Sequence, residues 1–148
     1  MPRLGSKDLL GIYKQTRTIA VVGASSNAEK PAHSIPRYLQ SQGYRIIRGG
    51  EIFGEHVYRS LREIDVPVDV VDVFRPPAEA EGVARDAIAI GAKVLWFQPG
   101  TSAEDAVRLA SAAGLAVVAE RCMGATHGEL GLGPGPEVSV GHVSARQD

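Results

Sequence analysis

Gly23, Ala24, Ser25 and Ser26 combine residue types that bind phosphate groups. They follow an unbroken apolar or β-branched run over residues 18–22, which is typical of a strand buried on both faces of a parallel sheet. A glycine after such a strand permits positive φ and a close approach of the backbone to a ligand. Serine hydroxyls and free N–H groups donate hydrogen bonds to phosphate oxygens. The pattern predicts that this loop holds the phosphates of a nucleotide.

Such a loop needs a sheet to position it, and segments typical of strands and helices alternate along the 148-residue chain. Ser34 as an N-cap before Pro36 predicts a helix that begins near residue 35 and ends at Gly43. The alternation predicts an α/β fold, a Rossmann-like doubly wound five-stranded parallel sheet with strand order 3-2-1-4-5. Its ligand would lie at the switch point between strands one and four. The expected strands cover residues 18–23, 44–48, 68–74, 93–98 and 115–120.

Length and composition favour one domain over residues 1–130 and a Gly/Pro-rich C-terminal tail over residues 131–148. The glycines and prolines after Cys122 predict a loose or draped segment. A net charge of −1 gives no overall attraction to nucleic acid or an anionic membrane, and no apolar run approaches the length that spans a bilayer. The start of the chain lacks a signal-peptide core, and a single cysteine suits a reducing compartment. We expect a cytoplasmic protein that binds neither nucleic acid nor membrane.

A dinucleotide is the default ligand of such a sheet, and two features argue against it. Ser25 and Ala28 stand where the dinucleotide fingerprint has its second and third glycines. The second strand ends on Arg48, where NAD requires an acid for its ribose hydroxyls. A basic residue there suits the extra ribose phosphate of NADP or coenzyme A (CoA), although an arginine that only solvates a strand end is about equally consistent with the sequence.

Several segments within residues 6–130 together identify a type of protein far more specifically than any one of them does. These segments are residues 19–25, 30–31, 38–40, 43–44, 68–75, 92–100 and 121–123. In this combination the chain resembles the small stand-alone CoA-binding domain proteins. Those proteins are themselves similar to the CoA-binding domain of the succinyl-CoA synthetase alpha subunit. The resemblance implies a Rossmann-like domain that binds coenzyme A and has no established reaction of its own.

The resemblance also implies roles for particular residues. Gly23, Ala24, Ser25 and Ser26 would hold the pyrophosphate. Lys30, Arg45 and Arg48 would meet the phosphate charges, including the 3′-phosphate. Phe74 and Arg75 would border the adenine, and Gln98, Pro99 and Gly100 would line the opposite side of the crevice.

No catalytic constellation emerges from the sequence. The synthetase's phosphorylated histidine belongs to a separate ligase domain that this chain lacks, and no histidine–acid pair is placed to activate Ser25 or Ser26. Cys122 and His127 do not have a zinc spacing, so no metal site is expected. We therefore expect a non-catalytic binding or regulatory module for CoA or an acyl-CoA. The alternatives are an NADP-dependent oxidoreductase or other nucleotide-dependent enzyme, and a protein-interaction subunit.

Overall fold

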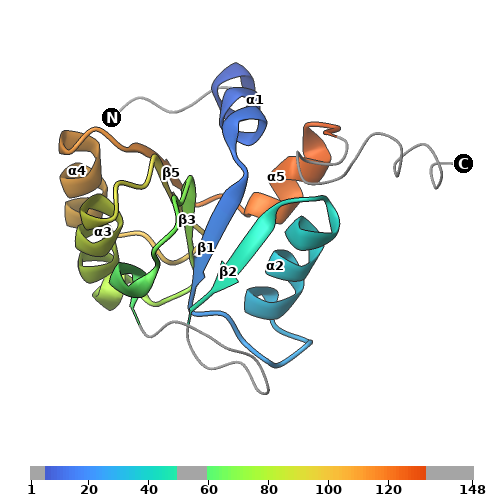
Figure 1. Ribbon diagram of the computed structural model, residues 1–148, viewed down its shortest axis with the longest axis horizontal. Helices are drawn as coiled ribbons and strands as arrows, with labels where there is room; N and C mark the ends of the chain where they lie inside the picture. Colours follow the sequence, from blue (N-terminus) through green and yellow to red (C-terminus); the bar gives the residue numbers. More distant parts are fainter. Residues whose placement is uncertain (1–5, 50–59, 133–148) are drawn as a thin grey trace, which may run out of the picture.

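The computed structural model describes residues 6–49 and 60–132, and it contains a five-stranded parallel sheet (Figure 1). Apolar and β-branched residues dominate every strand except the outermost β2, so most of the sheet is buried. The strand order is β2-β1-β3-β4-β5. The strands are β1 (Thr18–Val22), β2 (Arg45–Arg48), β3 (Val70–Val73), β4 (Val94–Phe97) and β5 (Ala116–Ala119).

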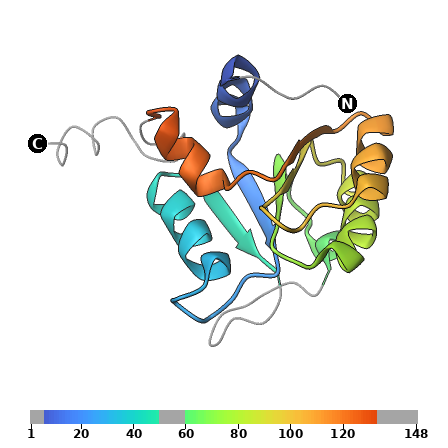
Figure 2. The ribbon, with the colours of Figure 1, turned by 180° about the vertical axis from the view of Figure 1, so that it is seen from behind.

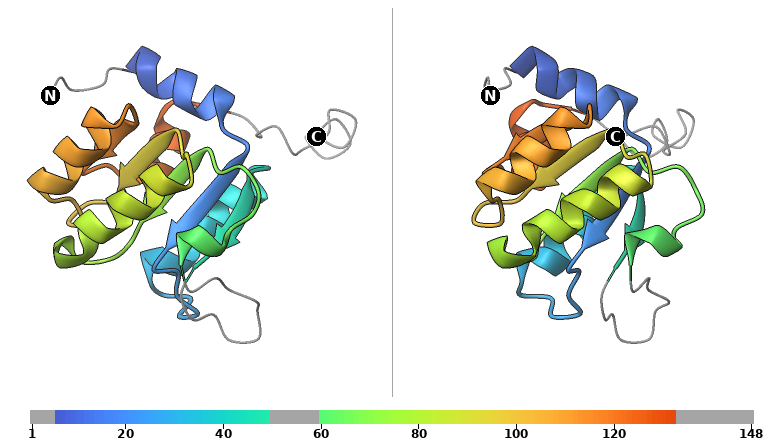
Figure 3. Two further views of the ribbon diagram at one scale, coloured as in Figure 1. Left: turned by 60° about the vertical axis from the view of Figure 1, so that its left-hand side comes forward. Right: turned by 90° about the vertical axis from the view of Figure 1, so that its left-hand side faces the viewer.

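Helices cover both faces of the sheet, which confirms the α/β, doubly wound fold class. Side chains of α1 (Ser6–Gln15), α2 (Pro31–Ser41) and α5 (Met123–Glu129) pack in one cluster on one face. Side chains of α3 (Ala80–Ala89) and α4 (Glu104–Ala112) pack on the other. Figure 2 shows α2 beside α5, and Figure 3 shows α3 beside α4. Two short 3₁₀ helices, η1 (Leu61–Glu63) and η2 (Pro77–Glu79), precede β3 and α3.

The strand order differs from the expected 3-2-1-4-5 in the position of β3. This strand lies between β1 and β4 instead of beyond β2 at the edge. All four of its residues are buried, as expected of a strand with neighbours on both sides and helices on both faces. The edge position belongs to β2, whose terminal residues Arg45 and Arg48 are exposed and half-buried. The switch point therefore lies between β1 and β3.

The helix expected from residue 35 begins four residues earlier, at Pro31. Pro31 is at the first helical position, where its missing N–H costs nothing, and Lys30 is the N-cap. Pro36 consequently lies inside the helix and cannot donate to the carbonyl of Ala32. That carbonyl instead accepts a hydrogen bond from the Ser25 N–H at 3.2 Å, which explains why the helix tolerates the proline.

The segment after Cys122 is also more ordered than expected, because residues 123–129 form α5. Gly124 makes this possible: a Cβ there would lie 3.3 Å from Ile35 Cγ2 and 3.5 Å from Tyr38 Cδ2 of α2. The glycine thus allows two helices to approach closely and bury Met123 and His127. Residues 133–148 of the expected tail lie outside the described residues. In residues 6–49 and 60–132, no helix is both long and apolar enough to cross a bilayer.

Candidate functional site

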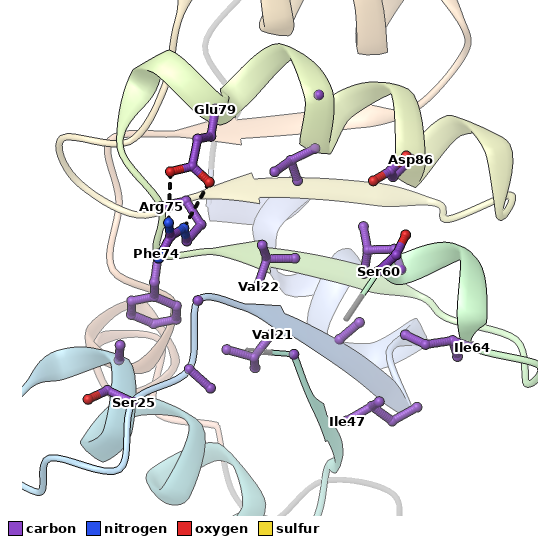
Figure 4. Close-up of a pocket in the computed structure, with 18 of the residues that line it drawn as sticks. Val21, Val22, Ser25, Ile47, Ser60, Ile64, Phe74, Arg75, Glu79 and Asp86 are labelled. Atoms are coloured by element: carbon purple, nitrogen blue, oxygen red, sulfur yellow. Dashed lines mark hydrogen bonds and ion pairs between the residues drawn. The ribbon is translucent and has the colours of Figure 1, made fainter. Parts of the chain in front are cut away.

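A groove of about 1090 Å³ opens at the carboxyl ends of β1 and β3, and we call it the switch-point groove (Figure 4). Its volume lies just above the usual range for small-molecule sites, about 300–1,000 Å³. The loop after β1 forms one wall, and residues of η1, η2 and α3 form the other. The lining includes Gly23, Ala24, Ser25, Ser26, Lys30, Ser60, Arg62, Phe74, Arg75, Glu79, Gly82, Arg85 and Asp86, with Ala20, Val22 and Ile47 of the sheet.

Gly23 is required by its backbone conformation and by its neighbours. Its φ is +90°, which strains any residue with a side chain. A Cβ on Gly23 would lie 2.6 Å from Arg75 Cδ and 3.2 Å from the carbonyl carbon of Phe74. The stem of Arg75 therefore lies against the backbone of Gly23, and the glycine brings the two sides of the switch point into contact.

The loop after Gly23 is anchored at several points. The Ala24 N–H donates to the Gly49 carbonyl at 3.1 Å, and the Ser25 N–H donates to the Ala32 carbonyl. His33 Nδ1–H donates to the Ser25 carbonyl at 2.9 Å, because a carbonyl can only accept. Both backbone polar groups of Ser25 are thus bound to the first turn of α2, so the loop is fixed without a ligand.

Three groups near this loop remain available to an anion. The Ser25 hydroxyl oxygen accepts from the Asn27 N–H at 3.0 Å, which leaves its own proton free to donate. The Ser26 N–H has no hydrogen-bond partner within the described part of the chain. The exposed Lys30 ammonium makes no ion pair with a described residue. Together these groups could bind a phosphate by charge-assisted hydrogen bonds.

The other three cations of the groove are each paired with a carboxylate. Arg75 donates to Glu79 through Nε at 3.0 Å and Nη2 at 2.8 Å, as Figure 4 shows. These hydrogen bonds hold the pKa of Glu79 below its usual range and raise that of Arg75. The other two pairs are Arg62 with Asp86 at 2.7 Å and Arg85 with Glu81 at 2.8 Å.

The structure brings together some of the residues expected from the sequence. Gly23, Ala24, Ser25, Ser26, Lys30, Phe74 and Arg75 all line the switch-point groove. Arg45 does not: it pairs with Thr18 at the amino end of the sheet, the end away from the groove. Arg48 also lies elsewhere, because its Nη2 donates to Gln40 Oε1 of α2 at 3.2 Å, on the opposite face of the sheet from α3.

Gln98, Pro99 and Gly100 do not line this groove either. Gln98 is 4% exposed, and its Oε1 accepts from the Met123 N–H at 3.0 Å, so it joins β4 to the start of α5. The Gly100 N–H donates to the Glu120 carboxylate at 2.9 Å. These contacts connect the loops after β4 and β5 to each other.

Sequence reasoning missed the wall formed by η1, η2 and α3, with its charged residues Arg62, Glu79 and Asp86. On the sequence these residues resemble an ordinary solvated helix face, and only the packing of α3 beside the switch point gives them a place in the groove. A second unexpected feature is Asp72, whose two carboxylate oxygens are buried without a hydrogen-bond partner among the described residues. Burial raises the pKa of Asp72 well above its usual range. The described residues contain no group of three or more metal-ligating side chains.

Comparison with known proteins identifies the family of the chain. The CoA binding domain family matches residues 17–128. The uncharacterized protein YneT of Bacillus subtilis (strain 168) is 33% identical over 120 residues, which are 78% of this chain and 89% of YneT. The solved structure of a hypothetical protein from Pyrococcus horikoshii OT3 has a TM-score of 0.81 at 36% identity, covering 86% of this chain and 92% of that one.

The fold also occurs within a much larger enzyme. A dinucleotide forming acetyl-coenzyme A synthetase from Ca. Korarchaeum cryptofilum matches 76% of this chain with a TM-score of 0.63 at 27% identity. The match covers only 28% of the synthetase chain. This chain therefore corresponds to one part of the synthetase and to most of the small relatives. With a family match over most of its length, the chain belongs to the CoA binding domain family.

Proposed function

We propose that this protein binds coenzyme A or an acyl-CoA in the switch-point groove and acts as a non-catalytic binding or regulatory module. The observation that carries the proposal is the anchored loop at residues 23–26, which lies at the switch point of a sheet whose family binds CoA. Ligands of open α/β sheets bind outside the carboxyl ends of the strands at this point.

In this proposal, the pyrophosphate lies on residues 23–26 and accepts from the Ser26 N–H and the Ser25 hydroxyl. Lys30 supplies charge to the phosphates. Phe74 and Arg75 border the adenine on the other side of Gly23. The proposal leaves out Arg45, which lies at the amino end of the sheet, away from the groove. It also leaves out Arg48 and residues 98–100, because Arg48 bonds Gln40, and Gln98 and Gly100 bond the segment after β5.

The anchored loop supports binding of this kind for a thermodynamic reason. Hydrogen bonds from Ala24, Ser25 and His33 fix the loop before a ligand arrives, so little conformational entropy is lost when it binds. The non-catalytic part of the proposal draws support from the sequence, which places no histidine–acid pair to activate Ser25 or Ser26.

A thermal-shift titration with CoA, acetyl-CoA, NADP and NAD at fixed salt tests the proposal. A ligand that binds only the folded state stabilises it by about 2.7 kcal/mol at a hundredfold excess over its Kd. We expect CoA or acetyl-CoA to raise Tm and both nicotinamide nucleotides to leave it unchanged. A rise in Tm with NADP alone would favour the oxidoreductase alternative.

Two lysine variants locate the site in the same assay. Lys30→Ala should weaken CoA binding by about tenfold, because a charge-assisted contact is lost. Lys14→Ala removes the same charge from an exposed position on α1 and should leave CoA binding unchanged. Equal effects of the two substitutions would mean that only net charge matters and that the ligand lies elsewhere.

A further inference from the structure

The charges of the switch-point groove are unusual for an anion site, because carboxylates accompany most of its cations. Arg62, Arg75 and Arg85 each bond a carboxylate of η2 or α3. Only Lys30 among the groove cations makes no ion pair with a described residue. Lys30 is therefore the unpaired cation that the described groove offers to a phosphate, and at each arginine a phosphate must compete with a carboxylate.

Arg75 is the arginine placed to change partners. Its stem carbons Cγ and Cδ lie against Gly23, the first residue of the loop that would hold phosphate. In Figure 4, Arg75 and Glu79 lie at one end of the groove, and Asp86 lies toward the other. The side chains of Arg75 and Glu79 are 46% and 47% exposed, so the guanidinium can rotate away from the carboxylate without disturbing the core.

We propose that Glu79 is a built-in competitor for the ligand's phosphates, holding Arg75 in the empty groove and releasing it when a phosphate binds. The inference rests on the proposed function and goes beyond it, because it assigns a residue that sets how strongly an anionic ligand must bind. Glu79 occupies the guanidinium through two parallel hydrogen bonds, the same geometry with which an arginine grips phosphate. Carboxylate and phosphate cannot both use the Nε and Nη2 edge of the guanidinium.

The following helix, α3, offers a matched comparison. Glu81 and Arg85 form another (i, i+4) pair, with a 2.8 Å distance and similar exposure. Glu81 is not among the described residues that line the groove. Removing either carboxylate changes the net charge by one unit and frees one arginine. Only the removal of Glu79 frees Arg75, the arginine whose stem lies against Gly23.

Isothermal titration of CoA into wild type, Glu79→Gln, Glu79→Asp and Glu81→Gln at one ionic strength tests the inference. Because the pair is exposed, we expect Glu79→Gln to lower the Kd by about two- to fivefold. Glu81→Gln should leave the Kd within about 1.5-fold of wild type. Glu79→Asp keeps the charge and should retain an affinity near that of wild type. The melting temperatures of the unliganded proteins verify that all three variants fold.

A spectroscopic readout follows Arg75 itself. In ¹⁵N-labelled protein, the Arg75 Nε–H resonance should move when CoA binds to wild type, because its acceptor changes from carboxylate to phosphate. An unchanged resonance would overturn the exchange.

The outcomes separate the inference from the proposed function. If CoA binds wild type and Glu79→Gln equally, Glu79 is no competitor, and the proposed function stands. If Glu79→Gln binds CoA more weakly, Glu79 contacts the ligand, and the inference is overturned. If CoA binds neither protein, the proposed function fails and the inference fails with it.

Discussion

Substitution of Gly23 by alanine probes the contact on which the switch-point groove is built. At a φ of +90°, a residue with a Cβ is strained by about 1–2 kcal/mol. The added Cβ would also lie 2.6 Å from Arg75 Cδ and 3.2 Å from the Phe74 carbonyl carbon. The arginine stem can move, but the backbone of Phe74 cannot move without shifting β3, and overpacking costs about 1–3 kcal/mol. We expect Gly23→Ala to lower the free energy of unfolding by about 2–4 kcal/mol.

Two other glycines separate the contributions. Gly91 has a φ of +74° and no atom within 4 Å of an added Cβ, so Gly91→Ala reports backbone strain alone and should cost about 1 kcal/mol. Gly82 lies inside α3 without positive φ and with the same open space. Gly82→Ala should stabilise the protein by about 0.5–1 kcal/mol, as expected in a helix interior.

Urea unfolding of the three variants measures these differences, with unchanged m-values as the sign that only stability has changed. In addition, Gly23→Ala should weaken CoA binding, because the displaced Arg75 stem no longer lies beside the loop. A Gly23→Ala variant no less stable than Gly91→Ala would refute the reasoning, because the close approach to Phe74 and Arg75 would then carry no energetic cost.

The buried Asp72 should make stability depend on pH. The pKa of Asp72 is raised in the folded state, so the free energy of unfolding falls as the pH rises above the pKa of an aspartate in the unfolded chain, about 3.9. Asp72→Asn should therefore be more stable than wild type by about 1–3 kcal/mol at pH 7. In urea titrations, the two proteins should become equally stable near pH 4. His33→Ala removes the bond to the Ser25 carbonyl and should cost about 0.5–1.5 kcal/mol and weaken CoA binding, as measured by urea unfolding and calorimetry. Arg48→Ala should leave the CoA affinity unchanged, in contrast to Lys30→Ala, because its side chain bonds α2 instead of facing the groove.

Each of these expectations has a contrary result. A constant difference between wild type and Asp72→Asn from pH 4 to pH 7 would mean that Asp72 is not neutral in the folded protein. Unchanged CoA affinity in His33→Ala would mean that the loop does not need this anchor. A large loss of affinity in Arg48→Ala would bring the ligand to the α2 face of the sheet.

All strands of the sheet except β2 were predictable as short apolar runs, and Gly23 marked the loop after the first of them. The position of β3 in the sheet was not predictable, because the run Val70–Val73 indicates a buried strand but does not indicate which strands lie beside it. The start of α2 was missed since Pro36 favours a helix's first turn. The helix interior tolerates this proline because the N–H of Ser25, a residue that precedes the helix, donates a hydrogen bond to the Ala32 carbonyl.

The residues of the candidate site also include some that could be predicted from the sequence and some that could not. Residues 23–26, which line the groove, could be named from local sequence, because glycine and serine indicate local backbone conformation and hydrogen-bonding capacity. Glu79 and Asp86 could not, because a charged residue on a helix has the same pattern whether it faces water or a groove. Likewise, the glycines of α5 indicated a loose segment, and only the packing of Gly124 against α2 makes them helical.

The central claim is that the loop after β1 holds the phosphates of CoA, and a ¹⁵N-amide NMR titration of the full chain with CoA tests it most directly. The account predicts saturable shifts that are largest at residues 23–26, Lys30 and Arg75, with little change at Arg45 at the amino end of the sheet. Saturable shifts centred on residues 98–100 and Arg48, or no shift with CoA at all, would contradict it.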